Sequence, residues 1–107
     1  MITVTIFKKE NQFSRVKSVG HAGYAAYGQD IVCSAVSVLL INTLNSIEKF
    51  TSDKVDVCSM ESGELICDFP QGLGHDGRLF MDSLILGLQE ISKEYGKDHL
   101  TLIFKEV

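Results

Sequence analysis

Residues 31–50 constrain the fold of this chain more than any other segment. Apolar side chains recur there at helical spacing, and the first charged side chain is Glu48. The apolar positions cover more than one stripe of the predicted helix, so the helix must be largely buried. Such a helix needs an apolar sheet face to pack against. The positions in question are Val32, Val36, Leu39, Leu40, Leu44, Ile47 and Phe50.

Segments in which apolar and polar residues alternate supply the strands of that sheet. The first two are rich in β-branched residues and are separated by a polar turn, which predicts an antiparallel hairpin. A second hairpin follows the helix, with Ser62 and Gly63 at its turn. A fifth alternating segment lies near the C-terminus. The predicted strands are residues 2–7, 13–19, 55–59, 65–69 and 100–104.

A second amphipathic helix is predicted between the fourth and fifth strands. Residues 79–95 carry apolar side chains every three to five positions, after a connection rich in glycine that contains Pro70. Gly96 suits the C-cap of this helix. The order ββαββαβ predicts a single α+β domain over residues 1–107, with a mainly antiparallel five-stranded sheet covered by two helices.

Charge and cysteine content narrow the functional classes. The net charge of −4 argues against direct nucleic-acid binding, which depends on Lys and Arg neutralising phosphates. Three cysteines cannot all pair within one chain and form no C-x-x-C motif, so a reducing cytoplasm is expected. The N-terminus lacks the pattern of a secretory signal. No segment reaches the roughly 18 uninterrupted apolar residues of a membrane span, so no membrane contact is expected.

The residues suited to chemistry concentrate between Gly20 and Ser37, in the stretch GHAGYAAYGQDIVCSAVS. Asp30 is a favoured helix N-cap and stands three residues before Cys33, where the apolar helical pattern begins. Cys33 would then be the third helical residue, where the macrodipole and the free N–H groups favour a thiolate. His21, just past the second predicted strand, is placed to remove or balance the proton of that thiol.

Other residues of this stretch are predicted to support the pair. Asp30 is predicted either to cap the helix alone or to cap it and also orient the imidazole of His21. Ser37 lies four residues after Cys33 and therefore on the same helix face, where its hydroxyl would support the site. The intervening loop is expected to be flexible and to order when a substrate enters. The residues that make it pliable are Gly20, Gly23 and Gly28.

The cysteines and the other histidines also have purely structural interpretations. Free cysteine is among the most buried residue types, and Cys58 and Cys67 lie in strand patterns typical of a core. His75, in a glycine-containing loop before a helix, is a weaker rival for the base, and His99 suits a solvated or structural role. Metal binding needs three or four convergent ligands, and the glycine spacing lacks the Lys-Ser/Thr ending of a P-loop. No metal and no other cofactor are therefore predicted.

The central motif resembles the signature of the bacterial ribosomal-processing cysteine protease family, called Prp. The resemblance covers essentially the whole chain, and its specific part is the stretch described above. No motif position departs from the pattern, so the catalytic histidine and cysteine of the family correspond to His21 and Cys33. The residues that carry the resemblance are Gly20 to Gly23, Gly28, Asp30 to Cys33, Val36 and Ser37.

The resemblance implies a homodimeric α+β endopeptidase. It implies removal of a short N-terminal extension from a large-subunit ribosomal protein whose mature N-terminus reaches toward the peptidyl-transferase centre. It further implies cleavage after a pair of phenylalanines, which would require an apolar cleft beside the thiol. On this interpretation Cys33 attacks the scissile carbonyl, and His21 protonates the leaving amine before it activates water.

Two other functional classes stay open at the level of the sequence. One is a non-catalytic ribosome-assembly or peptide-binding module in which Cys33 and His21 are structural. The other is a thiol redox sensor, which also uses a reactive cysteine. Neither explains the position of the histidine in the motif, so the protease hypothesis is preferred.

Overall fold

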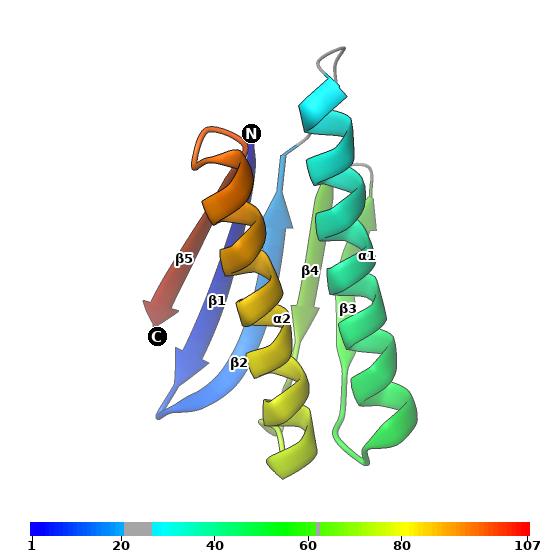
Figure 1. Cartoon of the computed structure of the whole chain (residues 1–107). Helices are drawn as coiled ribbons and strands as arrows, with labels where there is room; N and C mark the ends of the chain where they lie inside the picture. Colours follow the sequence, from blue (N-terminus) through cyan, green and yellow to red (C-terminus); the bar gives the residue numbers. More distant parts are fainter. Residues whose placement is uncertain (21–26, 62) are drawn as a thin grey trace.

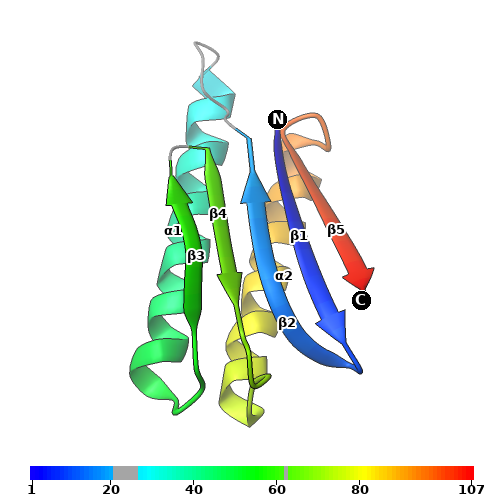
Figure 2. The same cartoon turned by 180° about the vertical axis from the view of Figure 1, so that it is seen from behind.

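The chain forms one sheet with two helices packed side by side on one face (Figures 1 and 2). The computed structural model describes residues 1–20, 27–61 and 63–107, with backbone only for residues 27–30. The element order is ββαββαβ, as predicted. The elements are β1 (Ile2–Lys9), β2 (Gln12–Val19), α1 (Tyr27–Phe50), β3 (Asp56–Glu61), β4 (Glu64–Asp68), α2 (His75–Tyr95) and β5 (Leu100–Glu106).

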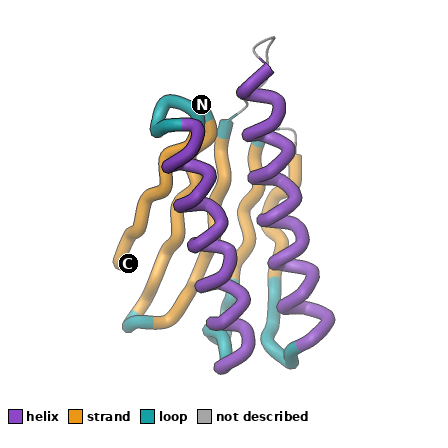
Figure 3. Tube along the Cα trace, in the orientation of Figure 1, coloured by secondary structure: helices purple, strands orange, loops and turns teal. Residues whose placement is uncertain are grey.

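The sheet has the strand order β3-β4-β2-β1-β5. β1 with β2, β2 with β4 and β3 with β4 pair antiparallel, which confirms a mainly antiparallel sheet. β5 pairs with β1 in parallel, because α2 carries the chain back along the sheet before β5 begins. The connections consequently gather at two opposite ends of the molecule (Figure 3).

The core lies between the sheet and the two helices. Alternate residues of β1 point toward the helices and are almost completely buried, as the period-two pattern predicts. α1 lies over the β3–β4 side of the sheet and α2 over the β1–β2 side (Figures 1 and 2). Core side chains with no measurable exposure include Val4, Ile6, Val16, Val32, Ile47, Met81 and Leu88.

α1 begins earlier than the sequence predicts. It spans 24 residues from Tyr27, so Asp30 lies inside the helix and is not its N-cap. Cys33 is therefore in the second turn and not at the third helical position. Gly28, predicted in the loop, lies in the first turn. The segment Tyr-Gly-Gln-Asp has no apolar periodicity and contains a poor helix former, which concealed the true start of the helix.

α1 is apolar enough to suit a membrane span by length and composition alone. The stretch Ile31–Phe50 has a mean hydropathy of 1.6, and 33% of its most apolar window is buried within the fold. Core helices of globular domains meet the same criterion. In this structure only one stripe of α1 packs against the sheet and α2, and the opposite face, which includes Val38 and Ile41, is exposed. The prediction of a largely buried helix was therefore wrong for the single chain.

Asp53, in the loop after α1, caps the N-terminus of α2. Gly74 precedes the helix and has no side chain to cap it, and its N–H lies 3.1 Å from each carboxylate oxygen of Asp53. The same carboxylate fills the space that a Cβ at Gly77 would need. With this cap supplied from a distant loop, α2 begins at His75 and includes Gly77, which the sequence assigns to the connection.

Replacing Asp53 by Ala should lower the free energy of unfolding by about 1–2 kcal/mol, because the first turn of α2 loses its capping carboxylate. Urea denaturation at neutral pH measures the change. Asp82→Ala, at an exposed position within α2, is the matched control and should stay within about 0.5 kcal/mol of the unsubstituted protein. Equal stabilities of the two variants would contradict the capping role.

Candidate active site

A cleft of about 140 Å³ lies between α1 and the β3–β4 hairpin, and Cys33 forms part of its wall. The first turns of α1 and the turn between β3 and β4 lie at the same end of the molecule, which brings these elements together (Figure 1). Cys33 is half-buried and packs against the core. The cleft is lined by Ile2, Ser18, Gly20, Cys33, Val36, Ser37, Leu40, Ile41, Met60, Glu61, Gly63, Glu64 and Leu65.

Five α1 residues line this cleft, and three of them form one row along the helix. Cys33, Ser37 and Ile41 are spaced four residues apart, so their side chains lie one above the other. The predicted position of Ser37 on the same face as the cysteine is therefore confirmed, while its supporting role stays a prediction. Because Cys33 is in the second turn, the helix-terminal stabilisation expected for its thiolate is weaker than the sequence suggested.

His21 and Gly23 lie outside the described residues, and so does the side chain of Asp30. The pairing of His21 with Cys33 thus stays a prediction that rests on the motif. The described part of the chain reaches Gly20, the residue that directly precedes the histidine, and resumes at Tyr27. The positions of Gly20 and Tyr27, the residues on either side of the segment that carries His21, are therefore known.

Gly20 is held by the neighbouring backbone. Its N–H donates to the carbonyl oxygen of Gly63 at 2.9 Å, which ties the end of β2 to the β3–β4 turn. Its φ of +114° is in the region that favours glycine, and a Cβ would collide with the carbonyl oxygen of Met1. The sequence predicts Gly20 as part of a pliable loop, whereas the structure explains it by backbone conformation and close approach.

The other histidines do not line the Cys33 cleft. His75 is the first residue of α2, at the opposite end of the molecule from the start of α1 (Figure 1). Its ring is exposed, and its Nδ1 atom lies 2.9 Å from a carboxylate oxygen of Asp76. The carbonyl oxygen of His99 accepts from the N–H of Ile2 at 3.0 Å, so this residue ties β5 to the start of β1. Within the described residues, no histidine lines the Cys33 cleft.

The two remaining cysteines differ in burial. Cys67 has no exposed surface, which confirms its predicted core position, and burial raises the pKa of its thiol to about 12. Cys58 is exposed, so the prediction of a core position was wrong. A bulge between Val57 and Ser59 interrupts β3 at this point, and β3 is an edge strand, which leaves the side chain in solvent.

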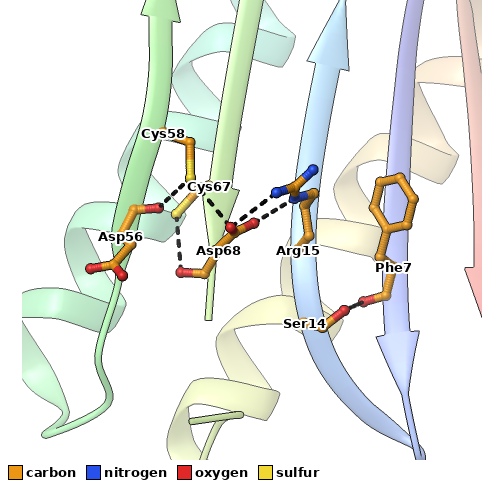
Figure 4. Close-up of polar contacts among 7 residues, drawn as sticks. All are labelled: Phe7, Ser14, Arg15, Asp56, Cys58, Cys67 and Asp68. Carbon is orange, nitrogen blue, oxygen red and sulfur yellow. Dashed lines mark hydrogen bonds and ion pairs between the residues drawn. The ribbon is translucent and has the colours of Figure 1, made fainter. Parts of the chain in front are cut away.

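An ion pair beside Cys58 lies on the sheet face that the helices leave uncovered (Figure 4). Nη2 of Arg15 donates to Oδ2 of Asp68 at 3.0 Å, and this guanidinium lowers the pKa of the carboxyl group. Cys58 Sγ lies 3.3 Å from Oδ2 of Asp68, and this hydrogen bond raises the pKa of the Cys58 thiol. Both cysteines outside the cleft are therefore held as thiols and are poorly suited to act as nucleophiles.

No set of three His, Cys, Asp or Glu side chains suited to a metal ion occurs in residues 1–20, 27–61 and 63–107. The residues that sequence reasoning missed are those of the opposite wall, above all Met60, Leu65 and Ile2. Ile2 and Leu65 lie in predicted strands and Met60 lies directly after one, but nothing in the sequence indicated that these strands would face Cys33.

Comparisons with known proteins identify relatives of this chain. Residues 1–99 match the family model for cysteine protease Prp. The ribosomal processing cysteine protease Prp of Staphylococcus aureus (strain Mu50 / ATCC 700699) is 31% identical over 100 residues, which cover 92% of this chain and 94% of that protein. The protein of the same name from Bacillus subtilis (strain 168) is 27% identical over 107 residues, covering 94% of each.

Solved structures show the same fold. The S. aureus protease Prp in complex with a substrate peptide superposes with a TM-score of 0.86 at 27% identity, covering 97% of this chain and 99% of that one. The S. aureus protease with a covalently linked product peptide gives a TM-score of 0.84 at 29% identity, with the same coverage. The chain therefore belongs to the Prp family of cysteine proteases.

Proposed function

We propose that this protein is an endopeptidase that processes a ribosomal protein, with Cys33 as nucleophile and His21 as general acid and base. The observation that carries the proposal is the position of Cys33 in the wall of an open cleft. The resemblance of the surrounding motif to that of the Prp family supports the assignment of Cys33 as the nucleophile. Cys67 is buried and Cys58 is hydrogen-bonded to a carboxylate, so neither competes for this role.

The proposed substrate is the N-terminal extension of a large-subunit ribosomal protein, cleaved after two phenylalanines. The names of the relatives support a ribosomal substrate, and the S. aureus protease has been solved with a substrate peptide. The cleft beside Cys33 supports the apolar preference, because six of its thirteen lining residues carry large apolar side chains. These are Ile2, Val36, Leu40, Ile41, Met60 and Leu65.

In the proposed reaction the Cys33 thiolate attacks the carbonyl carbon of the scissile peptide bond. The tetrahedral intermediate collapses to a thioester as the C–N bond breaks, and His21 gives its proton to the leaving amine. His21 then accepts a proton from water, whose oxygen attacks the thioester to release the carboxylate product and the Cys33 thiol. Backbone N–H groups toward the N-terminal end of α1 are the proposed donors to the oxyanion.

We also propose a cytoplasmic homodimer. The outward faces of the two helices expose large apolar side chains, with Val38 at 66% and Leu86 at 60% exposure, on helices that lie side by side (Figure 1). Apolar surface of this kind on a small domain marks an interface. Sedimentation equilibrium at micromolar concentration should give twice the chain mass, and a monomer at that concentration would contradict the proposal.

The proposed activity is tested with a synthetic peptide that spans the extension and the first mature residues of the ribosomal protein. Mass spectrometry after incubation with the unsubstituted protein should show two products whose masses place the cut after the second phenylalanine. A matched peptide with both phenylalanines replaced by alanine should be cut at least tenfold more slowly, because the apolar contacts of two side chains are lost. Intact peptide, or cleavage elsewhere, would contradict the proposed specificity.

A further inference from the structure

β3 forms an edge of the sheet directly beside the Cys33 cleft. It pairs with β4 on one side, and no strand of the described chain pairs with its other side. The residues from Val57 to Met60 are uncharged, and nearly all of β3 is exposed. Soluble proteins usually protect such edges with Lys, Pro or a covering segment, because the free N–H and C=O groups can pair with another strand. β3 has an acidic residue at each end, Asp56 and Glu61, but it contains no Lys or Pro that would prevent another strand from pairing with it.

The β3 side chains nearest the cleft face the helices. Met60 pairs with Leu65, which is buried, so both side chains lie on the helix-covered face of the sheet. Met60 is nevertheless 57% exposed, and Ile41 of α1, which lines the same cleft, is 40% exposed. A strand added to β3 would therefore place alternate side chains in the gap between β3 and α1, against these two residues.

The bulge between Val57 and Ser59 restricts where such a strand can pair. Regular pairing geometry is available at Ser59 to Glu61, the part of β3 that continues into the cleft wall. The opposite edge strand, β5, ends with Lys105 and Glu106 and contributes no residue to the cleft. An extended chain with its scissile bond at Cys33 can thus use the β3 edge and not the β5 edge.

We propose that the substrate peptide binds as an additional strand along Ser59 to Glu61, with the apolar residues that precede the cut packed against Met60 and Ile41. This inference rests on the proposed function and adds how the substrate is held. Main-chain pairing fixes the register of the scissile bond at Cys33, and the two side chains select bulky apolar residues. The peptide is favoured over a second copy of the chain as occupant because this part of the edge adjoins the nucleophile.

Hydrogen exchange tests the pairing directly. Cys33→Ala protein saturated with the uncut extension peptide should exchange the outward-facing amides of residues 59–61 at least tenfold more slowly than free protein, while β5 is unchanged. Unchanged exchange of residues 59–61 at saturation would overturn the inference. Protection that rises with protein concentration in the absence of peptide would overturn it in favour of a second copy.

Kinetics with modified peptides gives an independent test. N-methylation of successive peptide amides before the cut should raise KM about threefold to tenfold at alternate positions only, because alternate N–H groups face β3. Met60→Ala should raise KM for the Phe-Phe peptide, whereas Phe104→Ala, at a comparably exposed residue of β5, should not. Cleavage without the alternating pattern overturns the inference alone. If the peptide is neither cleaved nor bound, both this inference and the proposed function are overturned.

Discussion

Cys33→Ala should abolish cleavage of the extension peptide while the protein stays folded. Removal of a covalent nucleophile costs about four orders of magnitude or more in rate, because no other group can form the acyl intermediate. The fold should tolerate the change, since the half-buried side chain is small and lies at a cleft wall. Mass spectrometry of the peptide measures the loss of activity, and a thermal unfolding curve verifies the fold.

Cys58→Ala is the matched control for this experiment. Cys58 lies on β3 outside the cleft, and its thiol is bound to Asp68. Its removal should leave the cleavage rate within about twofold of the unsubstituted protein, since its side chain lies on the uncovered face of the sheet and does not line the cleft. Full activity of Cys33→Ala would exclude Cys33 as nucleophile. Loss of cleavage in both variants would show that the assay responds to any change of thiol content and not to catalysis.

Gly20→Ala should lower the free energy of unfolding by about 3 kcal/mol. The left-handed φ of +114° costs an L-residue about 1–2 kcal/mol. The new methyl group also meets the backbone carbonyl of Met1, which cannot move aside as a flexible side chain does, so relief requires displacement of β1 or β2. Denaturant titration followed by circular dichroism measures the loss.

Gly96→Ala separates the two contributions. Gly96 caps the C-terminus of α2 with a similar φ of +93°, but a Cβ there meets nothing within 4 Å. This variant should therefore lose about 1 kcal/mol, the cost of backbone strain alone. If the two variants lost equal stability, the close approach of Met1 to Gly20 would contribute nothing.

The sequence predicted the elements of the fold well because local periodicity decides them. The alternation of Ile2, Val4 and Ile6 becomes the buried face of β1, and Gly96 ends α2 as expected. The predictions were wrong where a residue distant in sequence determines the bounds or the exposure of an element. α2 starts at His75 because Asp53 caps it from another loop, a contact that no local pattern reveals. The bulge that exposes Cys58 likewise depends on the register between two strands.

The candidate site was predictable only in part for the same reason. Cys33 and Ser37 share a helix face through simple spacing, so their common position in the cleft follows from the sequence. The opposite wall, which includes Met60, depends on which strands α1 covers and thus on tertiary packing. The start of α1 was also missed, since a glycine in its first turn obscures the pattern.

The pairing of β1 with β5 has a consequence for synthesis of the protein. The first strand of the chain lies between β2 and its last strand, and the N–H of Ile2, a residue of the cleft wall, is bound to the carbonyl of His99. A nascent chain cannot make these contacts until residues 99–106 have left the exit tunnel. Completion of the sheet therefore waits for β5 and depends on pairing between distant parts of the chain, which is slow to form.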